Sequence, residues 1–143
     1  MSEPSERDMP ALPMLPTIGE RATRVCAFTS EMVAQFAALV GDHNPVHLDA
    51  DYAARTPFGY PIVHGMFVAS LISGILGERL PGPGSIYLGQ SLRFEAPVFV
   101  GDTVTASVEV IAVRAEKRIV TLRTECVRED GVRVISGEAA VKC

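Results

Sequence analysis

The sequence predicts an α+β domain in which helices lie on one face of an antiparallel sheet. Three observations predict this class. Residues 65–78 are apolar around nearly the whole circumference of a helix, residues 103–112 alternate between apolar and polar side chains, and short turns separate the strand-like runs of the C-terminal half. Because an apolar helix must be covered, we expect the sheet to curve around it.

The length of the chain, 143 residues, corresponds to one domain and excludes a separate cofactor-binding domain. Four of the ten prolines lie within the first sixteen residues. Proline removes backbone donors, so residues 1–18 are predicted to be a flexible arm and residues 19–143 the folded domain. A single domain of this size has little room to enclose a large ligand by itself.

The elements before the apolar helix have local signals of their own. Residues 21–28 alternate weakly and predict a strand. A helix is predicted to follow, capped by Thr29 or Ser30 and ended by Gly41, because apolar residues recur at helical spacing between these positions. Residues 42–62 contain prolines and glycines that interrupt regular structure, so only a short helical turn is predicted there, around residues 51–55.

The helix predicted over residues 65–78 has no polar face, so it is expected to be buried on all sides. Glycines and prolines at residues 81–84 end it. Strand-like runs separated by turn residues then cover 85–94, 103–112, 118–128 and 132–142. In the second run, the predicted buried face consists of Val104, Ala106, Val108, Val110 and Ala112.

Composition excludes several classes of protein. The net charge is -4 and no stretch is strongly basic, which argues against binding to nucleic acid or to anionic membranes. The longest apolar run, residues 66–76, is too short to span a bilayer, and the N-terminal residues lack the apolar core of a secretory signal. The cysteines, in no CxxC motif, argue against a zinc site, and no metal is expected. Reduced thiols in a cytoplasmic protein are expected at Cys26, Cys126 and Cys143.

All three histidines lie within residues 43–64, the least regular part of the domain. Asp42 and His47 are five residues apart on a predicted turn and allow two interpretations. In one, the aspartate caps the turn and the histidine bonds to a backbone carbonyl. In the other, the two form an acid–base pair in which the carboxylate removes a proton from water. A Ser-His-Asp triad is not indicated, because the sequence lacks GxSxG.

His64 and Gly65 open the predicted apolar helix. The free N–H groups at a buried helix N-terminus carry the positive end of the helix dipole. They suit a developing oxyanion, such as that of a thioester carbonyl. The alternative is structural: Gly65 only allows close packing, and His64 caps the helix or packs in the core.

Four segments carry a resemblance to a known family. They are GDHNPVH at 41–47, PIVHGM at 61–66, GSIYLGQ at 84–90 and FEAPVFVGD at 94–102. With them, nearly the whole domain resembles the (R)-specific enoyl-CoA hydratases of the MaoC-like group. The resemblance implies a hot-dog fold, in which an antiparallel sheet wraps a long central helix, and a homodimer that binds an acyl-CoA thioester near the subunit interface. It also implies a hydro-lyase, without a metal or redox cofactor, that reversibly adds water to trans-2-enoyl-CoA and gives (R)-3-hydroxyacyl-CoA.

The resemblance also implies roles for individual residues. Asp42 is the expected base, His47 positions the water and helps to deliver a proton to C2, and the N–H of Gly65 binds the thioester carbonyl. Helical spacing gives a face that would line the acyl tunnel of a hot-dog hydratase, and this face contains Ala69, Ser73 and Leu76. The bulk of Leu76 predicts short acyl chains, and ordinary core packing is the alternative for this face.

Three other functions are alternatives to this one. The same chemistry on a carrier-protein thioester would make the chain a 3-hydroxyacyl-[acyl-carrier-protein] dehydratase. A hot-dog thioesterase would release a free thiol, and a non-catalytic MaoC-like subunit would only bind acyl-CoA. The intact pair of Asp42 and His47 argues against the last two. The pathway stays open between polyhydroxyalkanoate monomer supply, fatty-acid β-oxidation and a specialised acyl-CoA route.

Overall fold

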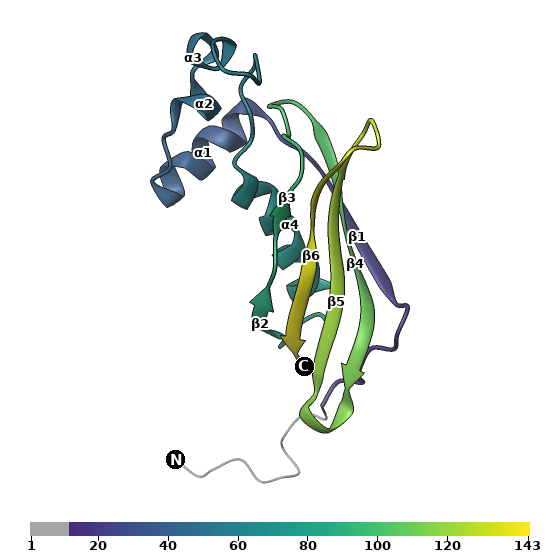
Figure 1. Cartoon of the computed structure of the whole chain (residues 1–143). Coiled ribbons are helices and arrows are strands. Elements are labelled where there is room, and N and C mark those ends of the chain that lie inside the picture. The colour runs from purple at the N-terminus through teal and green to yellow at the C-terminus, as the bar shows by residue number, and fades with distance from the viewer. Residues whose placement is uncertain (1–11) are drawn as a thin grey trace, which may run out of the picture.

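The computed structural model describes residues 12–143, which form one six-stranded sheet, one long helix that runs along it and a group of helices at one end of the molecule (Figure 1). All neighbouring strands pair antiparallel, in the order β1-β4-β5-β6-β2, and β3 also pairs with β6. The strands are β1 (Arg21–Ala27), β2 (Ile86–Gln90), β3 (Arg93–Phe94), β4 (Thr103–Arg114), β5 (Ile119–Arg128) and β6 (Arg133–Lys142). The helices are α1 (Ser30–Val40), α2 (Pro45–Leu48), α3 (Ala50–Ala54) and α4 (Gly65–Glu78), with the 3-10 turn η1 (Ala115–Lys117) between β4 and β5. The predicted α+β class is confirmed.

The helix α4 has the predicted bounds and runs alongside the sheet (Figure 1). Its sheet-facing side chains Val68, Ile72 and Ile75 are at most 1% exposed. They meet buried residues of the central strands, such as Val108 of β4 and Leu122 of β5, in one core cluster. A central helix covered by an antiparallel sheet is the hot-dog arrangement, as the resemblance implied.

One face of α4 is nevertheless open. Met66 is 60% exposed, and Ser70 and Ser73 on the same face are exposed as well. The prediction that this helix is buried on all sides is therefore wrong for the single chain. A sheet contacts a helix from one side, and the short edge strand β2 leaves the remaining face uncovered.

The buried face of β4 also differs from the prediction at one position. Burial alternates as predicted up to Val110, but a β-bulge lies between Val110 and Ala112 in the pairing with β5. An extra residue in one strand inverts the alternation beyond it. Ala112 is therefore exposed, and Val113 packs against the core instead.

The run predicted as one strand over residues 85–94 forms two short strands, β2 and β3, which both pair with β6. Between them the backbone of Ser91 passes very close to Gly137 of β6. A Cβ at Gly137 would lie 1.8 Å from the Ser91 carbonyl oxygen, so only glycine fits there. The close approach allows the N–H of Ser91 to donate to Glu138 while the strand breaks.

The predicted arm, residues 1–18, lies partly outside the described residues, which begin at residue 12. Within the described part, Leu15 packs against the core, and the Pro13 carbonyl accepts a hydrogen bond from Arg118 Nη2 at 2.6 Å. No helix in this described range is long and apolar enough to cross a membrane.

Candidate active site

The end of α1 places Asp42. Gly41 has a left-handed backbone (φ 77°), and the N–H groups of Gly41 and Asp42 donate to the Ala37 carbonyl at 2.9 and 3.1 Å. A residue with a Cβ is disfavoured in this conformation, so the predicted glycine ends the helix and turns the chain. Asp42 Oδ1 then accepts the N–H of Asn44 at 3.2 Å, which fixes the carboxylate at the start of the turn.

The short helix α2, which the sequence did not specify, carries His47. Asn44 caps it by accepting the N–H of Val46 at 3.2 Å, and Pro45 fits its first position because no N–H is needed there. The His47 ring Nδ1 donates to the Ile62 carbonyl at 2.7 Å. A carbonyl only accepts, so Nδ1 carries the proton and Nε2 keeps a lone pair that can accept a hydrogen bond from water.

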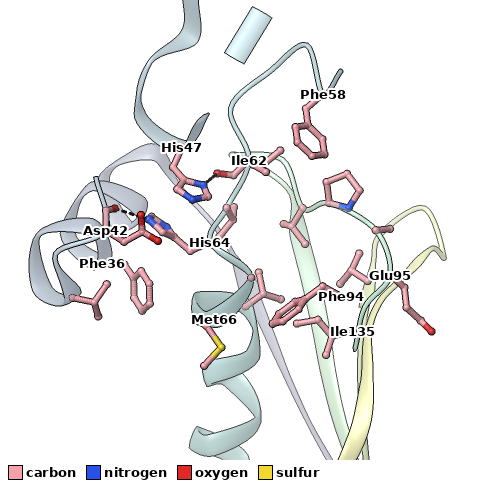
Figure 2. Close-up of a pocket in the computed structure, with 18 residues that line it drawn as sticks. Phe36, Asp42, His47, Phe58, Ile62, His64, Met66, Phe94, Glu95 and Ile135 are labelled. Carbon is pink, nitrogen blue, oxygen red and sulfur yellow. Dashed lines mark hydrogen bonds between the residues drawn. The ribbon is translucent and has the colours of Figure 1, made fainter. Parts of the chain in front are cut away.

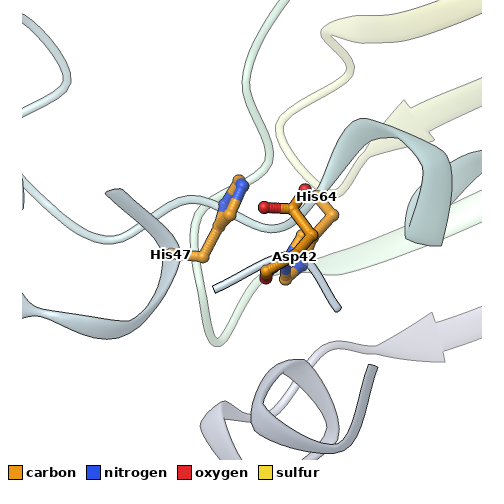
Figure 3. A group of neighbouring side chains, drawn as sticks. All are labelled: Asp42, His47 and His64. Atoms are coloured by element: carbon orange, nitrogen blue, oxygen red, sulfur yellow. The ribbon is translucent and has the colours of Figure 1, made fainter. Parts of the chain in front are cut away.

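His64, at the N-cap of α4, connects the two residues. Its Nε2 donates to the Asp42 carbonyl at 3.0 Å, and its ring stacks on that of His47 with centroids 3.7 Å apart. Asp42, His47 and His64 each offer a side-chain atom within 4.8 Å of the other two (Figure 3). Segments more than twenty residues apart in the sequence thus converge.

These residues border an apolar cavity of about 790 Å³ (Figure 2). Gly65 lies on the same wall, and the other lining side chains are mostly aromatic or aliphatic, including Phe36, Phe58, Ile62, Phe94 and Ile135. This size suits a small-molecule site with a few polar groups. A carboxylate and an imidazole at an apolar wall are the polar groups such a site needs to orient a reacting molecule.

Burial is the largest influence on His47 and lowers its pKa below the usual range, because the charged imidazolium is less well solvated there. The adjacent ring of His64 lowers the pKa of His47 further, because two imidazolium ions at this distance would repel each other. The hydrogen bond to Ile62 and the charge of Asp42 raise it in part. The ring is therefore neutral at neutral pH, as an acceptor for water must be.

The N-terminus of α4 supplies the donors of the site. The N–H groups of Phe67 and Val68 donate to the His64 carbonyl, whereas those of Gly65 and Met66 have no acceptor within residues 12–143. These N–H groups can stabilise a negative oxygen at the cavity wall. The ring of Phe94 packs close to Gly65: a Cβ on this glycine would lie 2.7 Å from Phe94 Cε1.

Asp42, His47 and His64 also form the cluster nearest to a metal-ligand set among the described residues. The two imidazole planes are inclined by only 29° and lie face to face. The lone pair of an imidazole nitrogen lies in the ring plane, so two stacked rings do not direct their lone pairs to one ion. The geometry suits an acid–base pair better than a metal centre, and the absence of a metal stays a prediction.

The structure brings together three of the predicted site residues, Asp42, His47 and Gly65. The three predicted tunnel residues lie elsewhere. Ala69 and Ser73 line a second cavity of about 400 Å³ beside β2, and Leu76 is 2% exposed in the core and lines neither cavity.

Sequence reasoning missed the contacts of His64 and the place of Phe94 in the cavity wall. The position of a histidine directly before the glycine that opens the apolar helix was the one available signal.

Comparison with known proteins gives consistent matches. The MaoC like domain family matches residues 16–131. The chain is 56% identical over 125 residues to an (R)-specific enoyl-CoA hydratase from Aeromonas caviae, which covers 87% of this chain and 93% of that protein. It is 50% identical over 114 residues to a 3-hydroxybutyryl-CoA dehydratase from Methylorubrum extorquens, covering 80% and 72%. A solved structure of an (R)-hydratase from A. caviae, involved in PHA biosynthesis, has a TM-score of 0.87 at 55% identity and covers 89% of this chain and 96% of that one.

Proposed function

Because the chain belongs to the MaoC-like domain family, we propose that it is an (R)-specific enoyl-CoA hydratase, a hydro-lyase that reversibly converts trans-2-enoyl-CoA into (R)-3-hydroxyacyl-CoA. One observation carries the proposal: Asp42, His47 and the N-terminus of α4 converge on one apolar cavity. The first two suit the activation of water, and the third suits a polarised carbonyl.

In the proposed mechanism, water binds between the Asp42 carboxylate and Nε2 of His47. Asp42 removes a proton from this water, whose oxygen forms a bond to C3 of the enoyl group. The N–H of Gly65 meanwhile stabilises the negative charge that develops on the thioester oxygen. Because Nδ1 of His47 is committed to Ile62, Nε2 of the neutral ring has no proton to give. We therefore assign to Asp42 the return of the proton to C2, on the same face as the hydroxyl, and to His47 the positioning of the water.

We place the acyl chain along α4 beyond Gly65. Ala69 and Ser73 border the second cavity. We propose that it takes short acyl chains, of about four to six carbons. The similarity to a 3-hydroxybutyryl-CoA dehydratase points the same way. Ser73→Leu, at an exposed position that lines this cavity, should lower the rate on octenoyl-CoA relative to crotonyl-CoA. Leu76 lines neither cavity, so it does not limit the chain length directly. An unchanged ratio in Ser73→Leu would refute the assignment.

A homodimer is part of the proposal, with the second copy along β2 and the open face of α4. β2 is the edge strand of the sheet, and its side chains Ile86 and Leu88 are 59% and 52% exposed. On α4, Met66 is exposed to a similar extent, 60%. Such an apolar edge is a template for pairing with another strand, and a partner there would close the second cavity. Light scattering should show a dimer. Ile86→Lys, on β2 but outside both cavities, should dissociate the dimer and lower the activity. Leu39→Lys, at an 85% exposed site on α1, should leave the dimer intact. A dimer that survives Ile86→Lys would place the interface elsewhere.

The central experiment is hydration of crotonyl-CoA, followed by loss of the enoyl-thioester absorbance and by the chirality of the product. Asp42→Asn and His47→Gln should each lower kcat by about 10²–10⁴-fold. An (S) product, or full activity in both variants, would falsify the proposal. Rates on crotonyl-carrier protein distinguish a carrier-protein dehydratase, and a thiol reagent detects thioesterase activity. Binding of acyl-CoA without turnover would indicate a non-catalytic subunit.

The expected cellular setting follows from the same chemistry. An (R)-3-hydroxyacyl-CoA is a monomer for polyhydroxyalkanoate synthesis, the process in which the A. caviae hydratase is involved. We propose a cytoplasmic location, which the three free cysteines support. Deletion of the gene for this protein from its host should lower the amount of polymer formed from fatty acids. An unchanged amount of polymer would favour a role in β-oxidation instead.

A further inference from the structure

His64 contacts both groups that the proposed reaction uses, although no step has been assigned to it. Its side chain is 3% exposed. It stands at the N-cap of α4 but makes no side-chain capping hydrogen bond, and histidine is not among the preferred capping residues. Helix capping therefore does not account for a histidine at this position.

The first contact is to the backbone of Asp42. His64 Nε2 donates to the Asp42 carbonyl at 3.0 Å, which ties the N-terminus of α4 to the turn after α1. Because the carbonyl only accepts, the proton lies on Nε2, and Nδ1 of the ring is unprotonated. Nδ1 is buried and has no hydrogen-bond partner among the described residues. Among the described residues, the buried His64 ring therefore makes one hydrogen bond, and its partner is the backbone of Asp42, whose side chain is the proposed base.

The second contact is to the ring of His47, at a centroid distance of 3.7 Å. Figure 2 shows the ring of His64 between those of His47 and Phe36. Phe36 lies 4.9 Å from His64 and stacks on Phe67 at 4.7 Å with an interplanar angle of 2°. Phe36, which packs on Phe67, therefore holds one side of the His64 ring, and the His64 ring contacts that of His47.

We propose that His64 is a positioning residue that fixes the Asp42 carboxylate relative to His47, its N–H holding the Asp42 backbone and its ring face holding the imidazole. The proposal rests on the hydratase function proposed above. Water must contact both groups at once, so a shift of either group lowers the reaction rate more than it weakens substrate binding. A misplacement of about 1 Å can cost about 10²-fold in rate.

Two substitutions separate the two contacts. His64→Phe keeps a ring that can stack but loses the N–H donor, and His64→Gln keeps a donor but loses the ring. Each variant should lower kcat by about 10- to 100-fold with KM changed by less than about threefold. Val108→Ala is the control for lost stability, because Val108 is fully buried in β4 and lines neither cavity. It should lower the melting temperature and leave kcat unchanged. If either His64 variant keeps kcat within about threefold of the wild type, the proposal is refuted.

The pH profile gives a readout that a purely structural role would not change. The titratable groups that face His47 are Asp42 and His64, and Glu95 across the cavity is paired with Arg133. Two imidazolium rings stacked at 3.7 Å would repel each other, and this repulsion lowers the pKa of His47. Replacing His64 with an uncharged side chain should therefore raise that pKa and move the acidic limb of kcat/KM to higher pH in both variants. An acidic limb that stays in place in active variants would contradict the proposal.

A measurement on the wild-type protein does not depend on the folding of any variant. Nitrogen-15 NMR of the imidazole rings should show the proton of His64 on Nε2 and that of His47 on Nδ1. A proton on Nδ1 of neutral His64 would mean that its bond to Asp42 does not exist, which refutes the proposal whatever the activity. The two proposals fail differently: an inactive wild type refutes the hydratase function, whereas an active wild type with equally active variants refutes the role of His64.

Discussion

Gly65→Ala tests the proposed oxyanion donor by adding one methyl group where α4 begins. A Cβ at this position would lie 2.7 Å from Cε1 and 2.8 Å from Cδ1 of Phe94. Ordinary contact begins at 3.4 Å, so the ring must retreat by about 0.7 Å, the difference between 3.4 and 2.7 Å. Phe94 is 55% exposed, and its ring can make this movement without unfolding the protein. The displaced ring and the new methyl group then occupy space beside the free N–H of residue 65.

We expect a large effect on rate and a small effect on stability. Loss of an oxyanion donor costs about 10²–10³-fold in kcat, and misplacement of the carbonyl by about 1 Å costs a comparable factor. Gly65→Ala should therefore lower kcat on crotonyl-CoA by about 10²-fold. Because Gly65 stands in the first turn of the helix and the ring can move, the melting temperature should change by only a few degrees.

The matched control is Gly77→Ala in the last turn of the same helix. A Cβ at Gly77 meets nothing within 4 Å, so no side chain has to move. The change should raise the free energy of unfolding by up to about 1 kcal/mol, because alanine favours the helix, and leave kcat unchanged. Alanine keeps the backbone N–H, so the variant tests the space beside it. If Gly65→Ala keeps kcat within about threefold of the wild type, the thioester carbonyl does not lie between Gly65 and Phe94 as proposed.

Three further predictions concern titration and buried polar groups. Burial lowers the pKa of His47, so an NMR titration should find its midpoint below pH 6.5, and a midpoint above 6.5 would contradict the geometry. Activity needs the neutral ring, so it should fall as the pH drops through that midpoint. Burial raises the pKa of Cys126 to about 12, so iodoacetamide at mildly alkaline pH should alkylate Cys126 only after unfolding. In the folded protein, mass spectrometry should find the half-buried Cys143 alkylated instead. Gln90 Nε2 donates to the buried Thr124 hydroxyl at 2.9 Å, so Gln90→Ala should lower the free energy of unfolding in urea melts by about 1–2 kcal/mol. Adding Thr124→Val removes the unpaired hydroxyl and should restore part of this loss.

Local signals predicted most of the elements. Thr29 caps α1 and Gly41 ends it, and α4 begins at residue 65 and ends at residue 78, because caps, glycines and helical periodicity act within a few residues. The same reasoning failed where a distant segment intervened. The bulge in β4 arises from its pairing with β5 and exposes Ala112, and the break between β2 and β3 reflects the close approach of Ser91 to Gly137.

The chemistry of the site divides in the same way. The sequence by itself determined which groups are available: a carboxylate and an imidazole on one turn, and a glycine at the start of an apolar helix. Only the tertiary structure decided which nitrogen of His47 carries its proton, because the acceptor is the Ile62 carbonyl, fifteen residues away. It also decided that His64 lies against both Asp42 and His47, and that one face of α4 is left open. The physical reason is common to these cases: backbone caps and periodicity are short-range, whereas hydrogen-bond partners, ring stacking and burial depend on segments that meet only when the chain is folded.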